Sequence, residues 1–144
     1  MSPSRFSEYT IHRRVMFHEV DSAGIVHFSV YFRYMEEAEH ALWREAGLSI
    51  APAGSEVGFP RVAAAFEYHR PLRFEDEFDA RIRVVAMGKK SVKYSCTLTK
   101  GSETIATGSV TVVCVSRRPG EAMKARPLPP EIVERFTVSP EGSE

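Results

Sequence analysis

The chain has 144 residues, of which 43% are hydrophobic, a composition typical of one globular domain (residues 1–144) that buries its own core. Its 19 basic and 19 acidic residues cancel, which argues against a general nucleic-acid-binding protein because such proteins carry a basic excess. No apolar run reaches about 18 residues, the length of a membrane span, and the first ten residues lack the apolar region of a signal peptide, so we expect a cytoplasmic protein.

The chain opens with a predicted β-strand over residues 9–20. Alternate residues of a strand point to opposite faces. One face is expected to carry Ile11, Val15 and Phe17, and the other His12, Met16, His18 and Val20. The turn-forming sequence Asp21-Ser-Ala-Gly24 then ends the strand.

Residues 30–46 are predicted to form the one long helix. Apolar residues recur there at steps of three and four, the period of a helix rather than of a strand. They are Tyr31, Tyr34, Met35, Ala38, Ala41, Leu42 and Ala46. We expect the hydroxyl of Ser29 to cap the first turn and Gly47 to end the helix in a left-handed conformation. A sheet is expected to wrap around this helix.

After a loop over residues 48–60, the period changes to two, which predicts four further strands. They run from Val62 to Tyr68, Phe78 to Ala86, Val92 to Leu98 and Ile105 to Val115. The last of them is also apolar on its other face, at Val110, Val112 and Cys114, so we expect it to be central and covered on both sides. Short turns favour antiparallel pairing. A short helix with proline in its first turn is predicted over residues 129–136.

This order, a strand, a long helix and four antiparallel strands, defines an α+β fold with a five-stranded sheet. One helix cannot cover both faces of such a sheet, so the uncovered surface implies a partner, most simply a second copy of the chain. Cys96 and Cys114 lack the spacing of metal ligands, and we expect both to be reduced thiols in the core.

Three segments of the chain resemble a known family. They are VDSAGIVHFSVYFRYMEEA (residues 20–38), FEYHRPLRFEDEF (residues 66–78) and VVAMGKKSVKYS (residues 84–95). They resemble the acyl-CoA thioesterases of the hotdog fold, and most closely the 4-hydroxybenzoyl-CoA thioesterase-like branch. The block D-x-A-G-I-V-x-F-x-x-Y-F-R, from Asp21 to Arg33, is the most specific part, and the resemblance runs from about Val15 to Val115.

The resemblance implies a long helix wrapped by an antiparallel sheet, with two subunits joined edge to edge. It also implies that such homodimers often form homotetramers. The implied reaction is hydrolysis of an acyl-CoA thioester to a free acid and CoA, with no metal and no other cofactor. We expect the active site to lie at the dimer interface, because one helix end cannot enclose an acyl group.

Asp21 is the first catalytic candidate. Unpaired N–H groups at the start of a helix stabilise developing negative charge, so a thioester carbonyl held there would be polarised. A carboxylate at the preceding strand end could attack that carbonyl or activate water. The resemblance gives Asp21 this role and makes the backbone N–H of Phe28 the polarising amide. The alternative is that Asp21 only stabilises a turn.

Three further residues lie in or near this block and are alternative candidates for a role in the site. A related branch carries a functional histidine where this chain has Phe28, so we interpret the neighbouring His27 as a residue at the rim of the site. Strand alternation places His18 on the face opposite Asp21. Glu36 is a second catalytic candidate, because another hotdog branch uses a helix carboxylate, although a solvated glutamate is the simpler interpretation.

The turn at Lys89 and Lys90 is the candidate for binding the CoA phosphates, since the family carries basic residues there and ammonium groups suit phosphate. Arg117 and Arg118 are a weaker pair. The aromatic residues of the helix are expected in the core or an interface, with one of them lining an acyl pocket, and Phe59 could reach a neighbouring subunit's site. These residues are Tyr31, Phe32 and Tyr34.

Two other functions fit the same fold. A hydratase or dehydratase of acyl thioesters would need a histidine paired with a carboxylate, and His27 with Glu36 is the nearest pair. A non-catalytic module would bind acyl-CoA and release it unchanged. The sequence leaves open the acyl group, the choice between CoA and an acyl carrier protein, and whether Asp21 is a nucleophile or a base.

Overall fold

The computed structural model describes residues 5–140. Its strands are β1 (Glu8–Arg14), β2 (Val57–Gly58), β3 (Arg61–Tyr68), β4 (Glu77–Met87), β5 (Ser91–Lys100), β6 (Glu103–Val113) and β7 (Val115–Ser116). Its helices are the 3-10 turn η1 (Phe17–Glu19), the long α1 (Val30–Glu45) and the short α2 (Pro130–Arg135).

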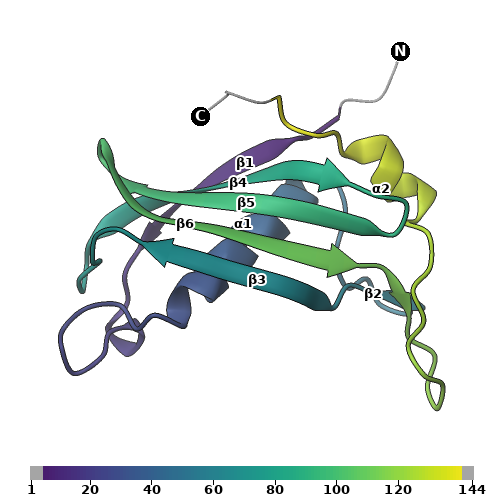
Figure 1. Cartoon of the computed structure of the whole chain (residues 1–144), viewed down its shortest axis with the longest axis horizontal. Coiled ribbons are helices and arrows are strands. Elements are labelled where there is room, and N and C mark those ends of the chain that lie inside the picture. The colour runs from purple at the N-terminus through teal and green to yellow at the C-terminus, as the bar shows by residue number, and fades with distance from the viewer. Residues whose placement is uncertain (1–4, 141–144) are drawn as a thin grey trace.

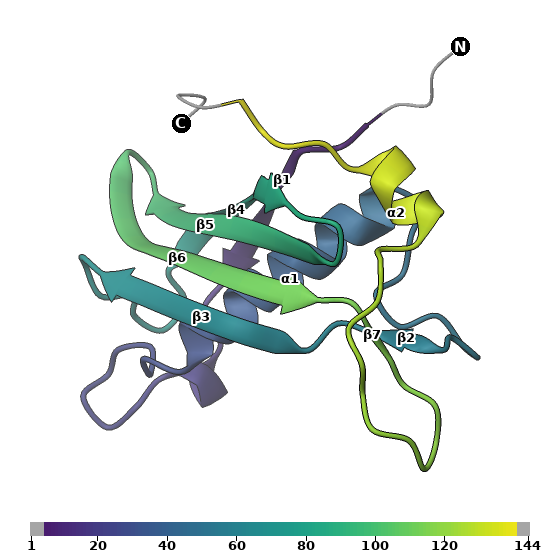
Figure 2. The same ribbon diagram turned by 45° about the vertical axis from the view of Figure 1, so that its right-hand side comes forward.

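The main sheet has five antiparallel strands in the order β1-β4-β5-β6-β3, and β2 pairs with β7 in a separate ribbon. Helix α1 packs across one face of the main sheet, whereas no helix lies over the opposite face within residues 5–140 (Figure 1). The loop between η1 and α1 lies at one end of the molecule, and α2, β2 and β7 lie at the other (Figures 1 and 2). The predicted α+β fold, a long helix wrapped by a five-stranded sheet, is confirmed.

The apolar stripe of the sequence explains where α1 forms and which face it buries. The stripe residues are buried against the sheet together with Trp43, while Arg33 and Glu36 on the other side are exposed. The end of the helix matches the prediction, because Gly47 has a φ of 79° and Leu48 N donates to Trp43 O at 2.8 Å. The start differs, since the Ser29 hydroxyl does not cap the helix but pairs with His27 Nδ1 at 2.8 Å.

The first strand is shorter than the predicted 9–20. Pairing with β4 stops at Arg14 opposite Glu77, and the chain then turns through η1. The Met16 N–H, which a longer strand would have paired, donates instead to the Glu19 carboxylate at 2.7 Å. Phe17 is consequently 74% exposed and not in the core, contrary to the alternation.

Two strands also differ in which residues face the core. A bulge in β4 between Val84 and Ala86 reverses the alternation, so Ala86 is exposed. Strand β6 is next to the edge, not central, and β5 takes the central place. The Thr107, Ser109 and Thr111 face of β6 is only partly covered, so the prediction that β6 is covered on both sides is wrong for the single chain.

The core lies between α1 and the sheet and continues to α2. Both cysteines are free and buried, as predicted. Burial raises the pKa of the Cys96 thiol to about 12, so this sulfur stays protonated and unreactive. Over the described range, no helix is long and apolar enough to cross a membrane.

Candidate active site

Asp21 lies on a tight hairpin loop between η1 and α1. Val20 and Val26 form an antiparallel bridge at its base, and Asp21 N donates to Ile25 O at 2.9 Å. Gly24 N returns to Asp21 O at 3.0 Å, and Gly24 has a φ of 81°, which a residue with a side chain rarely adopts. The turn sequence thus fixes Asp21 at the first position of a closed loop, directly after the bridge at its base.

One oxygen of the Asp21 carboxylate is engaged and the other is not. Oδ1 accepts from Ala23 N at 2.8 Å, which is the Asx-turn contact that the sequence offered as the alternative role. Oδ2 has no partner among residues 5–140, and the side chain is half-buried. The turn contact therefore orients the carboxylate while leaving one oxygen available for chemistry.

The amide of Phe28 lies two residues before the start of α1. Within the part of the chain that the structure describes, its N–H donates to no acceptor, while its carbonyl accepts from the Tyr68 hydroxyl at 2.8 Å. Phe28 as a residue is 65% exposed, so it lies at the surface of the molecule. An unpaired N–H at a helix start can stabilise an oxyanion.

Asp21 borders two cavities. The more polar of the two has a volume of about 570 Å³ and is surrounded by His18, Glu19, Val20, Asp21, His27, Ser29, Val30 and Arg33. The other, of about 500 Å³, is mainly apolar, and its wall is formed by Asp21, Ile25, Val26, Phe28, Tyr31, Tyr68, His69, Arg70 and Pro71. A ligand that spans both cavities would pass the Asp21 carboxylate.

One of the three aromatic residues of the helix lines the apolar cavity. Tyr31 lines it, with the Tyr68 ring edge-on at 4.9 Å between centroids. Tyr34 is buried elsewhere, and Phe32 packs on Phe66 at 5.1 Å. Phe59 does not face a site within this chain, because it packs against Trp43 at 5.1 Å.

Two histidines lie beside Asp21. His27 is exposed at the rim of the polar cavity, where the sequence placed it, and its ring lies 4.5 Å from that of Phe28. His18 was predicted on the face opposite Asp21, and this is wrong. Strand alternation does not apply to η1, and the turn brings His18 to the same cavity as Asp21.

Other candidates are not brought to this site in the single chain. Glu36 lies on a separate cavity with Arg61, whose Nη2 is 3.1 Å from Glu36 Oε2. Within the single chain, Glu36 therefore does not meet His27 to form the pair that a hydratase would need. Lys89 and Lys90 lie in the β4–β5 turn, at the end of the sheet opposite Asp21, and Arg118 pairs with Glu56 at 3.6 Å. Across residues 5–140, no group of three or more histidine, cysteine or acidic side chains could hold a metal ion.

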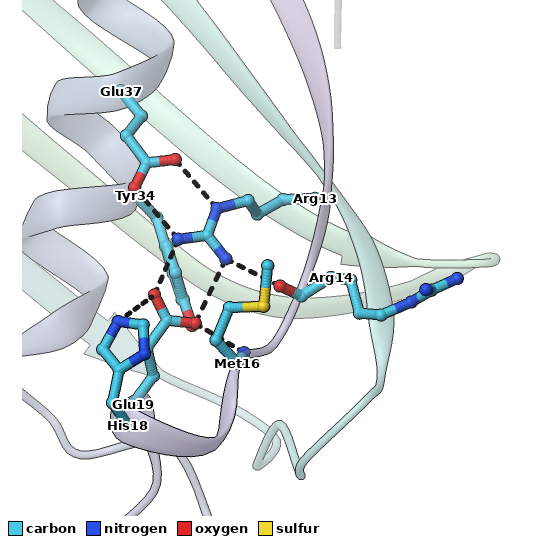
Figure 3. Close-up of polar contacts among 7 residues, drawn as sticks. All are labelled: Arg13, Arg14, Met16, His18, Glu19, Tyr34 and Glu37. Atoms are coloured by element: carbon cyan, nitrogen blue, oxygen red, sulfur yellow. Dashed lines mark hydrogen bonds and ion pairs between the residues drawn. The ribbon is translucent and has the colours of Figure 1, made fainter.

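Sequence reasoning missed Glu19, which lines the polar cavity with Asp21 and is 5% exposed. Its carboxylate receives hydrogen bonds from Arg13, the Met16 N–H and the Tyr34 hydroxyl (Figure 3). Burial alone would raise the pKa of Glu19, but these bonds outweigh it and lower the pKa below its usual value. The only signal in the sequence was a glutamate three residues after Met16, which is half of a capping box for the turn η1.

This chain is similar in sequence and in structure to several known proteins. Residues 15–136 match the model of the Thioesterase-like superfamily. An Aquifex aeolicus (strain VF5) protein with a provisional esterase name is 36% identical over 86 residues, which cover 58% of this chain and 66% of the relative. The 1,4-dihydroxy-2-naphthoyl-CoA hydrolase of Synechococcus elongatus is 22% identical over 136 residues, or 92% of this chain and 98% of that protein. The solved structure of a gentisyl-coenzyme A thioesterase is 28% identical, with a TM-score of 0.75 over 87% of this chain and 99% of that one.

Proposed function

The chain belongs to the thioesterase-like superfamily and has its hotdog fold, and from this premise we propose how this thioesterase acts. It hydrolyses an acyl-CoA thioester to a free acid and CoA. Asp21 is the catalytic carboxylate, and the Phe28 N–H polarises the thioester carbonyl. The gentisyl-CoA and dihydroxynaphthoyl-CoA relatives support CoA as the carrier of the acyl group.

The observation that carries the proposal is the position of Asp21 between a polar and an apolar cavity. The acyl group would occupy the apolar cavity beside Tyr31 and Tyr68, and the pantetheine arm would leave through the polar one. The thioester carbon would then lie beside the free Oδ2 of Asp21, and its oxygen would face the Phe28 N–H. Both groups act on the same bond, as acyl transfer requires.

Two routes are consistent with this arrangement. Asp21 takes a proton from a water that attacks the carbonyl, or Asp21 attacks the carbonyl itself and water then hydrolyses the mixed anhydride. In both routes the carbonyl oxygen becomes an oxyanion at the Phe28 N–H. The C–S bond then breaks, the acid leaves with the oxygen of water, and CoA leaves as the thiol.

We further propose that the working enzyme is a homodimer, and that two dimers form a homotetramer. Lys89 and Lys90 remain the proposed contacts for CoA phosphates. Because they lie at the far end of the sheet from Asp21, this role requires them to serve the site of another subunit. Glu36 would likewise reach the chemistry only in an assembled site.

The test is release of free thiol from a panel of aromatic and aliphatic acyl-CoAs. Asp21→Asn keeps the shape of the side chain and removes its basicity, so we expect kcat to fall by about a hundredfold or more. Asp79→Asn is the matched control, because Asp79 lies on the outer face of the sheet and pairs with His12. It should retain the wild-type rate.

Other outcomes reject the proposal in distinct ways. Release that survives in Asp21→Asn removes Asp21 from the chemistry. A wild-type chain that releases no thiol but adds water to an acyl thioester, or removes water from it, through His27 and not Asp21 is a hydratase or dehydratase. A wild-type chain that binds acyl-CoA and releases it unchanged is a binding module.

A further inference from the structure

Glu19 is a buried carboxylate two residues before Asp21, held between β1, η1 and α1 (Figure 3). We propose that Glu19 is a positioning residue that fixes the Asp21 hairpin relative to the start of α1. This inference deepens the proposed function and rests on it. Glu19 acts through Asp21 and Phe28 and does not touch the thioester.

The side chain of Glu19 joins three elements. Arg13 of β1 donates from Nη2 to Oε2 at 2.6 Å and from Nη1 to Oε1 at 3.1 Å. The Met16 N–H, before η1, donates to Oε1 at 2.7 Å, and the Tyr34 hydroxyl of α1 donates to the same oxygen at 2.9 Å. A single carboxylate therefore ties the first strand and the 3-10 turn to the helix.

The backbone of Glu19 forms the base of the catalytic hairpin. Its carbonyl accepts from His27 N at 3.0 Å, next to the Val20–Val26 bridge. His27 is followed at once by Phe28, whose N–H is the proposed polarising group. The two proposed catalytic groups therefore follow directly from the two paired arms of the hairpin. Asp21 comes after Val20 on one arm, and the Phe28 amide comes after His27 on the other.

Glu19 is not itself free to act as the base. Its two oxygens receive four hydrogen bonds, and its charge is compensated by the partly buried guanidinium of Arg13. Arg13 also lies over the Tyr34 ring at 5.0 Å from its centroid, which holds the cation in place. By contrast, Asp21 keeps an oxygen with no partner in the described chain.

The geometry between Asp21 and the Phe28 N–H therefore depends on how the hairpin sits on α1. The Tyr34 hydroxyl of α1, which donates to Glu19 at 2.9 Å, sets this position directly. A misplacement of about 1 Å between reacting groups costs up to about a hundredfold in rate. Losing Glu19 should thus slow the chemical step while leaving the cavities that bind the substrate.

The experiment compares Glu19→Gln with Glu37→Gln. Both changes remove one negative charge that pairs with Arg13, but only Glu19 also holds Met16, Tyr34 and the hairpin. We expect Glu19→Gln to lower kcat at least tenfold with KM within about twofold of wild type, at a temperature well below its melting point. Glu37→Gln should keep kcat within about twofold.

Tyr34→Phe provides an independent variant that keeps the carboxylate. It should lower kcat by a smaller factor, and it should lower kcat hardly at all when Glu19 is already glutamine, because both changes act through the same positioning of the hairpin. A purely structural role predicts instead that kcat loss follows the fraction unfolded in every variant. Equal losses in Glu19→Gln and Glu37→Gln, or a change in KM alone, overturn the proposal.

Amide hydrogen exchange tests the positioning role of Glu19 without measuring activity. In folded Glu19→Gln, the N–H groups of Asp21, Gly24 and His27 should exchange at least tenfold faster, while those of β5 stay protected. Unchanged exchange at the hairpin rejects the positioning role. If the wild-type chain releases no thiol, the proposed function fails, and the exchange result still decides the role of Glu19.

Discussion

Glu19 and Asp21 are carboxylates two residues apart on one short loop, yet their surroundings give them opposite roles. Glu19 is buried and its carboxylate receives four hydrogen bonds, which hold the loop in place. Asp21 is half-buried and bonded through one oxygen only. Residue type alone therefore does not identify the candidate catalytic base in this chain, and the number of unoccupied carboxylate acceptor positions distinguishes Asp21 from Glu19.

His12 gives a residue-scale prediction on pH. Its ring lies 2.9 Å from Glu77 and 2.8 Å from Asp79, and the bonds to these carboxylates raise the pKa of His12 above 6.5. The pKa of Glu77 is lowered below 4.5, first by the bond to His12. The His12 contribution to stability is therefore complete below pH 6.5 and disappears as the pH rises through the pKa of the folded state.

The contribution of Glu77 has the opposite sign, since it is present above pH 4.5 and lost as the pH falls through the lowered value. NMR titration should show both shifted pKa values. The free energy of unfolding, measured with urea, should fall less for His12→Asn than for the wild type as the pH rises from about 5.5 to 8. A His12 pKa at or below 6.5 in the folded protein would contradict this account.

At the scale of elements, the β3–β6 pair shows how a glycine makes room for the core. Gly108 of β6 lies opposite Phe66 of β3, and a Cβ on Gly108 would meet ring atoms of Phe66 at 2.7 Å. The ring cannot move freely, because it packs on Phe32 and lies 5.9 Å from Tyr31. Gly108 is thus the position where this strand accepts no side chain.

We predict that Gly108→Ala destabilises the protein by about 1–3 kcal/mol, the usual cost of overpacking a core. Thermal or urea unfolding measures the loss. In a Phe66→Leu background the ring is absent, so the same glycine substitution should cost less. An equal cost in both backgrounds would show that the clash with Phe66 is not the cause.

The elements of the fold were largely predictable from the sequence, because α1 and β5 have one face in the core and the period of their apolar residues records it. Prediction failed at residues 15–20, where Phe17 continues the alternation although the partner strand ends at Glu77. It failed again at Ala86, since a bulge leaves no mark in the apolar pattern.

The candidate site was only partly predictable. Asp21 and Phe28 followed from a motif in one short stretch. Glu19 did not, because its role depends on Arg13 and Tyr34, which lie 6 and 15 residues away and meet it only in the folded chain. Such contacts between residues far apart in sequence are set by tertiary packing and not by the local sequence.

At the scale of the whole molecule, β3 is an edge strand of eight residues in the five-stranded sheet. Within residues 5–140 its outer backbone edge pairs with no other strand, and Val62 is 60% exposed. Long edges with exposed apolar residues are sites of strand pairing between chains. This supports the proposal that two copies join here, close to Tyr68 and the apolar cavity.

We therefore predict a dimer in sedimentation or light-scattering measurements. Val62→Asp would place a charge from each copy at the proposed β3–β3 contact, so it should shift the equilibrium towards monomer and reduce thiol release together. Val133→Asp is the control, because Val133 is a similarly exposed valine on the distant α2. Dissociation without loss of activity would show that one chain holds a complete site.

The burial of Trp43 has an optical consequence. It is the one tryptophan of the chain, it is 1% exposed, and its indole N–H donates to the Tyr94 hydroxyl at 2.9 Å. Phe59 and Phe136 enclose the ring, and it lies near the C-terminal end of α1, far from the Asp21 hairpin. Its fluorescence should be blue-shifted in the native state and move to longer wavelength on unfolding. A ligand that fills the two cavities should leave this emission unchanged, so the same signal can separate loss of the core from occupancy of the site.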